Sequence, residues 1–86
     1  MPRVHLPALL RPLAGDTSSV LVEASTVRGV IDALDRRFPG MGDRLIEKGA
    51  IRPEIIIAIA GDETRDLSAA VAADADVHIL PAIAGG

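Results

Sequence analysis

Two glycines, Gly85 and Gly86, close the sequence and are its strongest candidates for chemistry. Glycine makes up about 7% of an average protein, so a closing pair arises by chance in roughly one chain in 200. Without Cβ atoms, the pair adopts backbone angles closed to other residues and fits a channel too narrow for side chains. The only reactive group it delivers is the terminal carboxylate, an anion at neutral pH that must be activated before it reacts as an electrophile. Activation as an acyl-adenylate would turn Gly86 into an acyl donor.

No other residues in the sequence form a recognisable catalytic set. His5 and His78 are the only histidines, and two histidines without further ligands do not satisfy a zinc ion, which takes four. Positions on the exposed side of strands explain them better. The acidic residues lack the spacing of a calcium loop, no phosphate-binding lysine loop is present, and G-x-S-x-G is absent. We therefore expect a protein that is not itself an enzyme, binds no metal and no cofactor, and leaves ATP binding to a partner.

Composition excludes several partner classes. The chain has 86 residues, a formal net charge of −3 and a single aromatic residue, Phe38, so neither a basic surface nor stacking platforms are available for nucleic acid. It contains no cysteine, which excludes a disulfide or a side-chain persulfide. No stretch approaches the roughly 20 apolar residues that span a bilayer, and residues 1–10 lack the features of a signal peptide. A cytoplasmic location is expected.

The elements that would position Gly86 begin with a hairpin and a helix. Val4, Leu6 and the leucines at 9–10 predict a first strand, and the turn-rich segment 11–19 leads into a second strand over 19–25, so the two form a hairpin with a longer loop. Apolar residues then recur at helical spacing, which predicts a helix over 26–37 with Ser25 or Thr26 as its cap.

The second half of the sequence alternates short elements with two strands. Residues 41–49 are equally compatible with one or two helical turns and with a loop. The nearly continuous apolar run at 54–61 predicts a strand at an internal position of a sheet. Residues 61–63 are typical of a turn, residues 66–72 of a short turn of helix, and residues 77–80 of the last strand.

This order of elements predicts an α+β fold of the β-grasp kind. One long helix covers one face of a mixed sheet of four to five strands and leaves the other face bare. We expect the strand after the helix to run parallel to the first, and the last strand to lie centrally and lead out into the tail. The domain is expected to span residues 1–81, followed by a flexible tail over 82–86 that extends at most about 17 Å.

The sequence also resembles a known family. The helix at 26–47, the strand and turn at 55–67 and above all the ending DADVHILPAIAGG at 74–86 are similar to the MoaD/ThiS family of ubiquitin-like sulfur carriers. The resemblance implies that an ATP-dependent adenylating enzyme activates Gly86 and that a sulfur donor converts it to a thiocarboxylate. A downstream synthase would then accept the sulfur. The segments ILPAIAGG and RFPGMGDRLIE most resemble the carriers for cysteine biosynthesis and the small subunits of molybdopterin synthase, with the thiamin carriers a weaker match.

By the same resemblance, partners dock on the bare face of the sheet and on the start of the tail. The partner-binding residues implied are Leu80, Pro81, Ile83, Ala84, Gly85 and Gly86. For Leu80 the residues leave two positions open: the exposed face opposite Val77 and Ile79, or a small core position beneath a loop.

Two other functions fit the ending. In one, the chain is a ubiquitin-like modifier joined through Gly86 to lysines of other proteins. In the other, it is a non-covalent binding module that uses the sheet face and does not need Gly86. Conjugates that resist reducing agents would mark the first alternative, and activity without Gly86 would mark the second.

Overall fold

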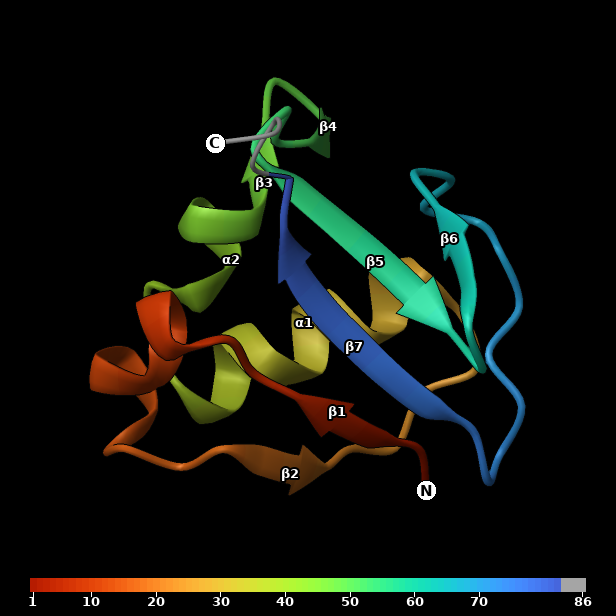
Figure 1. Ribbon diagram of the computed structural model, residues 1–86, viewed down its shortest axis with the longest axis horizontal. Coiled ribbons are helices and arrows are strands. Elements are labelled where there is room, and N and C mark those ends of the chain that lie inside the picture. Colours follow the sequence, from red (N-terminus) through yellow and green to blue (C-terminus); the bar gives the residue numbers. More distant parts are fainter. Residues whose placement is uncertain (83–86) are drawn as a thin grey trace.

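A computed structural model describes residues 1–82, which form one mixed sheet with helices beside it (Figure 1). The strands are β1 (Arg3–His5), β2 (Ser19–Leu21), β3 (Ile46–Glu47), β4 (Ala50–Ile51), β5 (Ile55–Ile59), β6 (Asp62–Thr64) and β7 (Asp76–Pro81). The helices are the 3-10 helix η1 (Ala8–Ala14) and the α-helices α1 (Val27–Arg37) and α2 (Met41–Leu45). None of the helices within residues 1–82 is long and apolar enough to cross a membrane.

The main sheet has five strands in the order β2-β1-β7-β5-β6. Only β1 and β7 run parallel, whereas the pairs β1–β2, β5–β7 and β5–β6 are antiparallel. The α+β class, the β-grasp arrangement and the central position of the last strand are confirmed. The expected parallel strand was misassigned: β5 does not pair with β1, and the last strand, β7, takes the parallel position instead.

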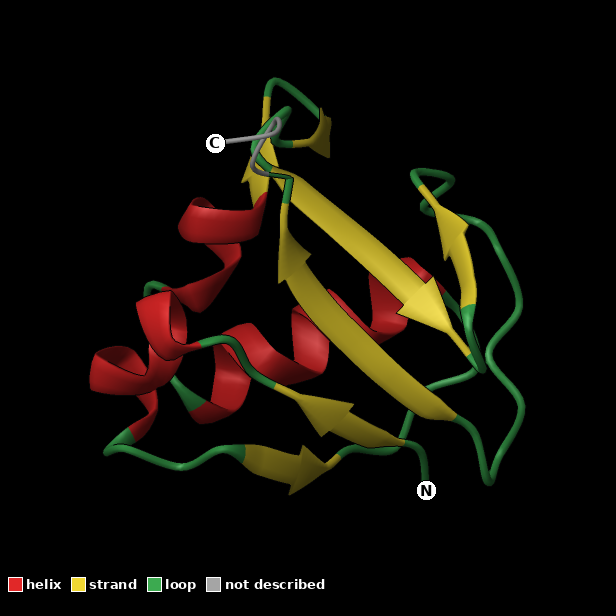
Figure 2. Ribbon diagram, viewed as in Figure 1, coloured by secondary structure: helices red, strands yellow, loops and turns green. Residues whose placement is uncertain are grey.

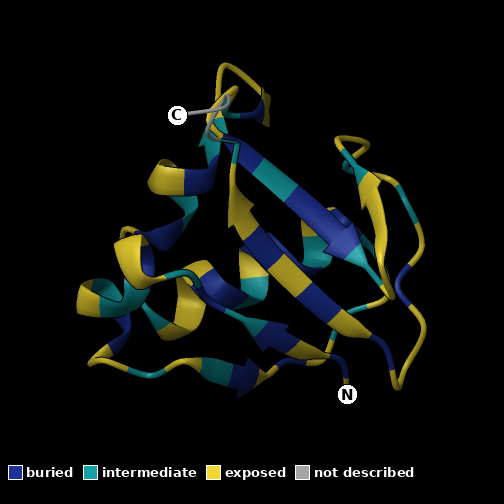
Figure 3. Cartoon of the chain, viewed as in Figure 1, coloured by how far each residue is buried: buried dark blue, intermediate teal, exposed yellow. Residues whose placement is uncertain are grey.

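Helix α1 packs across one face of this sheet (Figure 2). Its apolar stripe, Val27, Val30, Ile31 and Leu34, is buried, and the Oγ1 atom of Thr26 accepts the N–H of residue 29 at 3.1 Å as the helix cap. The predicted helix over 26–37 and its cap are therefore confirmed. The core fills the layer between α1 and the sheet, where buried positions alternate with exposed ones along β7 (Figure 3).

Two segments form elements other than those predicted. The leucines at 9–10 lie in η1 and do not extend β1, whose ladder ends at His5; Leu10 enters the core while Leu9 is 57% exposed. The turn predicted at 61–63 lies instead at Ala60 and Gly61, which both have positive φ and make a tight hairpin turn, so residues 62–64 form the edge strand β6.

The segment 66–72 was predicted as a turn of helix, and this is wrong. Its carbonyl groups serve another helix: Ala69 and Leu67 accept the N–H groups of Val27 and Arg28, at 3.0 and 2.9 Å. These are the first N–H groups of α1, which have no partner within the helix itself. The segment therefore does not form a helix of its own, and its carbonyls cap the N-terminus of α1. Residues 41–49 form α2 and then β3, which pairs with β4 (Ala50–Ile51) in a small antiparallel hairpin.

Candidate functional site

The tail root, defined here as residues 80–82, is the last described part of the chain and is held by β5. Pro81 lies opposite Ile55 in the antiparallel ladder. One residue further on, the N–H of Ala82 donates to the carbonyl of Glu54 at 2.7 Å. Pairing with residues 54 and 55 therefore holds the backbone in place up to Ala82. The predicted site residues Ile83, Ala84, Gly85 and Gly86 lie outside the described residues, so Ala82 is the only described residue of the expected tail at 82–86.

The carbonyl that holds Ala82 belongs to a tight corner between β4 and β5, residues 51–55. Within this β4–β5 corner, the N–H of Ile55 donates to the carbonyl of Arg52 at 3.0 Å, and Pro53 takes the second position of the turn, where its fixed φ is favourable. The guanidinium of Arg65 reaches the same corner from the segment after β6. It donates to the carbonyls of Ile55 at 2.6 Å and of Ile51 and Arg52 at 2.8 Å each.

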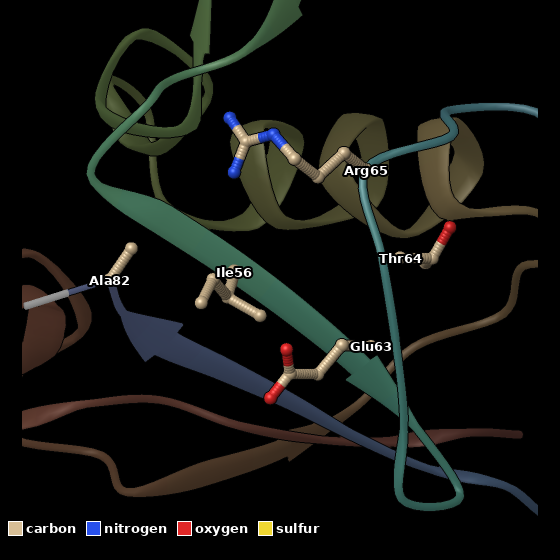
Figure 4. A pocket seen from close by; sticks show the side chains of 5 residues that line it. All are labelled: Ile56, Glu63, Thr64, Arg65 and Ala82. Carbon is tan, nitrogen blue, oxygen red and sulfur yellow. The ribbon is translucent and has the colours of Figure 1, made fainter. Parts of the chain in front are cut away.

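An open groove of about 350 Å³ lies beside the tail root. Its lining residues are Ile56, Glu63, Thr64, Arg65 and Ala82. In Figure 4, the side chains of Glu63 and Arg65 both extend from the β6 segment toward β5, with Ile56 between them. The groove thus borders the tail root on one side and, on the other, the face of the sheet opposite α1.

The outer face, defined as the sheet face opposite α1, carries a small apolar area next to the tail root. Ile56 lies opposite Leu80, and Ala58 lies opposite His78. Leu80 is 36% exposed while its neighbour Ile79 is 1% exposed. The alternation therefore places Leu80 on the outer face, which settles the two positions left open by the sequence. Pro81, the other described residue of the predicted partner-binding set, is also exposed.

Polar groups gather on the same face, where β1 and β7 meet. The rings of His5 and His78 stack with centroids 4.2 Å apart and planes inclined by 8°. The Nε2 of His5 also lies 2.8 Å from a carboxylate oxygen of Asp76. This hydrogen bond holds the pKa of Asp76 below its usual value. Because an ionised carboxylate only accepts hydrogen bonds, Nε2 is assigned as the donor.

The two histidines occupy partly or fully exposed strand positions, as the sequence indicated. Within residues 1–82 there is no group of three or more histidine, cysteine or acidic side chains arranged to hold a metal ion.

Sequence reasoning missed two residues of this region. Arg65 lies between the turn predicted at 61–63 and the helical turn predicted at 66–72, and its acceptors lie 10 to 14 residues earlier in the chain, so no local pattern indicates its role. Ile56 had a usable signal. Strict alternation along β5 puts it on the same face as Leu80, but the continuous apolar run concealed that alternation.

Comparison with known proteins places the chain in a family. Residues 4–86 match the ThiS family, almost the full length. The chain belongs to the ThiS family. The sulfur carrier protein CysO of Mycobacterium tuberculosis is 33% identical over 96% of both chains. Family membership confirms the expected resemblance, and this is a family of small carriers rather than enzymes.

Solved structures of similar chains share the fold. The structure of the BexX/CysO complex of Amycolatopsis orientalis includes a chain that matches over 100% of both chains with a TM-score of 0.94 and 30% identity. The small archaeal modifier protein 1 of Methanosarcina acetivorans matches with a TM-score of 0.83 and 27% identity, over 99% of this chain and 95% of its own. A carrier and a modifier are thus both built on this fold.

Proposed function

We propose that this chain is a sulfur carrier whose Gly86 carboxylate is adenylated by an ATP-dependent activating enzyme and converted to a thiocarboxylate. The thiocarboxylate then donates its sulfur to a biosynthetic synthase. The observation that carries the proposal is the match to the ThiS family over residues 4–86, together with 33% identity to the sulfur carrier CysO over 96% of both chains. The matched region includes the two closing glycines.

The chemistry needs no side chain of this protein as a catalyst. The Gly86 carboxylate attacks the α-phosphorus of ATP, so pyrophosphate leaves and a mixed anhydride with AMP forms. Sulfide then attacks the acyl carbon and AMP leaves with one of the original carboxylate oxygens, so one oxygen has been exchanged for sulfur. Cysteine is absent from the sequence, which is consistent with sulfur being held on the backbone terminus.

The described residues supply the presentation of that terminus. Residues 82–86 act as the tail in this proposal, and they begin where the ladder with β5 ends at Ala82. Exposed Leu80 and Pro81 at the tail root, and Ile56 beside Leu80, form the docking area for the activating enzyme. Ile83, Ala84, Gly85 and Gly86 then enter that enzyme's active-site channel, which glycine at the last two positions keeps narrow.

Intact-mass measurement tests the proposal directly. The protein is incubated with an adenylating enzyme for ThiS-family carriers from the same organism, ATP and sulfide. The expected product has one oxygen replaced by one sulfur, and omission of ATP or deletion of Gly86 abolishes it. Unchanged mass of the wild-type protein in the complete reaction, with the enzyme shown to be active on its own carrier, contradicts the proposal.

Cysteine biosynthesis is the downstream pathway that the similarity to CysO favours, with molybdopterin biosynthesis as the alternative. The thiocarboxylate form is supplied as the only sulfur source to a cysteine synthase with O-phosphoserine, or to the large subunit of molybdopterin synthase. Stoichiometric cysteine in the first reaction supports the cysteine pathway. Product in the second reaction alone assigns the protein to molybdopterin.

Conjugation to proteins is a second candidate function, favoured by the likeness to small archaeal modifier protein 1. In that case an ε-amino group of a target lysine attacks the activated Gly86 and displaces AMP. Tagged protein expressed in its native host would appear in higher-mass bands that survive thiol reducing agents. Such bands, lost when Gly86 is deleted, support the modifier role.

A further inference from the structure

Arg65 connects the edge of the sheet to the part of the chain that holds the tail root. Its guanidinium donates three hydrogen bonds, of 2.6 to 2.8 Å, to carbonyls of Ile51, Arg52 and Ile55. These three carbonyls belong to the β4–β5 corner. The carbonyl of Glu54, in the same corner, accepts the N–H of Ala82. One side chain therefore fixes the corner on both sides of the residue that holds the last described backbone bond.

We propose that Arg65 is a positioning residue that, through the β4–β5 corner, sets the direction in which the tail root presents Gly86 to its activating enzyme. The effect on the tail root follows from the contacts of residues 51–82, whereas the consequence for adenylation rests on the proposed function.

The chemistry of the site requires arginine. A guanidinium is a rigid planar fork with five N–H donors, so it reaches several carbonyls at once. A lysine ammonium is a single compact point of charge on a flexible stem and does not span the same set. The acceptors recorded for Arg65 are all backbone carbonyls, so its charge is directed to holding backbone geometry.

Other contacts hold the corner through Arg52, whose N–H donates to the carbonyl of Leu45 at 2.8 Å and whose Nε donates to the carbonyl of Asp43 at 2.7 Å. These contacts hold the amide and the side chain of Arg52, whereas Arg65 holds the carbonyls of Ile51, Arg52 and Ile55. The hairpin β3–β4 that precedes it has only two residues in each strand, and Glu54 itself is exposed. The turn bond from Ile55 to Arg52 closes one side at 3.0 Å. Without the guanidinium, the carbonyls of Ile51 and Ile55 would turn to water and the carbonyl of Arg52 would keep only the turn bond from Ile55. The direction of the Glu54 carbonyl would then be less firmly fixed.

Amide hydrogen exchange tests the positioning role without any partner enzyme. In Arg65→Met, we expect the Ala82 N–H to exchange about tenfold faster, since the acceptor that protects it is no longer held. Amides of α1 should be unchanged. Arg36→Met is the matched control, because Arg36 is exposed on α1 and makes no side-chain hydrogen bond within residues 1–82. Unchanged exchange at Ala82, or equal acceleration throughout the chain, overturns the inference.

Arg65→Lys keeps the charge and provides a second variant if the methionine variant does not fold. It should still accelerate exchange at Ala82, because one ammonium cannot hold all three carbonyls. Protection at Ala82 equal to that of the wild type in the lysine variant also overturns the inference, since it would mean that charge alone suffices.

Steady-state kinetics of ATP–pyrophosphate exchange by the activating enzyme test the consequence. A misdirected tail root lowers the fraction of bound carriers in a productive geometry, so kcat should fall about tenfold for Arg65→Met while KM stays within about twofold. A raised KM with unchanged kcat contradicts the tail-presentation step. If the activating enzyme catalyses no ATP–pyrophosphate exchange with the wild-type carrier, the proposed function is contradicted. Hydrogen exchange at the Ala82 amide tests the positioning role in either case.

Discussion

His5 and Asp76 face each other across the parallel strands β1 and β7, with the imidazole Nε2 2.8 Å from a carboxylate oxygen. His78, which lies opposite His5 in the ladder and two residues after Asp76, stacks on the same imidazole. The outer face thus carries a hydrogen-bonded polar cluster beside the apolar area around Leu80. Because the hydrogen bond from His5 lowers the pKa of Asp76, this pair links the stability of the fold to pH.

Asp76→Asn should lower the free energy of unfolding at pH 7 and leave it unchanged in acid. A carboxyl whose pKa is lower in the folded state than in the unfolded state stabilises the fold above the unfolded pKa, about 4 for aspartate. That contribution disappears as the pH falls through the lowered folded pKa. Urea denaturation of wild type and variant at pH 7 and at pH 3 or below should therefore show a gap that closes at acid pH.

The matched control for this prediction is Asp74→Asn. Asp74 is exposed two residues earlier and makes no side-chain hydrogen bond within residues 1–82. Its substitution should produce a smaller gap at pH 7 than Asp76→Asn does. A gap for Asp76→Asn that persists or widens in acid would contradict the linkage to the His5 hydrogen bond.

Leu80→Ala should weaken binding to the activating enzyme while leaving the fold nearly as stable as before. The side chain is 36% exposed, and substitutions at such surface positions usually change stability by less than about 1 kcal/mol. A buried contact in a protein interface is often worth more than about 1.4 kcal/mol, a tenfold change in Kd. Calorimetry of carrier and enzyme gives the affinity, and urea denaturation gives the stability.

Leu34→Ala provides the opposite pattern. Leu34 is fully buried on α1 beneath the sheet, so its truncation removes apolar contacts and leaves a cavity, at a cost of about 3 kcal/mol. The folded fraction should keep its affinity for the enzyme. Equal losses of affinity in the two variants would argue against a docking role for Leu80.

The sequence predicts the frame of this fold because its signals there are local and repeated. Helical spacing of Val27, Val30 and Leu34 together with the cap at Thr26 marks α1 almost to the residue. The alternation of buried and exposed positions in β7 also follows from neighbouring residues, although for Leu80 it left two positions open. Both patterns arise because the residues are buried against the one core layer between α1 and the sheet.

The remaining elements depend on contacts that are distant in the chain. Arg65 acts on carbonyls 10 to 14 residues away, and the carbonyls of segment 66–72 serve the start of α1, about 40 residues earlier along the chain. The edge strand β6 is polar because the sheet ends there, so apolar alternation could not reveal it. The expectation that the strand after the helix runs parallel to β1 was wrong at β5, because strand pairing depends on the whole sheet and not on neighbouring residues.

Thr26→Ala should destabilise the protein by about 1 kcal/mol, the usual cost of losing an N-cap. The Oγ1 atom of Thr26 accepts the N–H of Gly29 at 3.1 Å, and alanine offers no acceptor to that group. Thr26→Ser retains the oxygen and is the control, with an expected change of a few tenths of a kcal/mol. Urea denaturation at neutral pH measures both. Equal losses for alanine and serine would assign the effect to the lost methyl group instead.

The hairpin turn between β5 and β6 should respond in opposite directions to two neighbouring substitutions. Ala60 has φ 51° and Gly61 has φ 91°, a pair of left-handed residues for which Asn-Gly is the preferred sequence. Ala60→Asn should therefore raise the free energy of unfolding by about 0.5 kcal/mol, because asparagine tolerates this region better than alanine. Gly61→Ala should lower it by about 1 kcal/mol. A Cβ at Gly61 would meet no atom within 4 Å, so the loss reports backbone strain alone. Thermal and urea denaturation of both variants check the signs; a stabilising Gly61→Ala would show that the turn changes conformation.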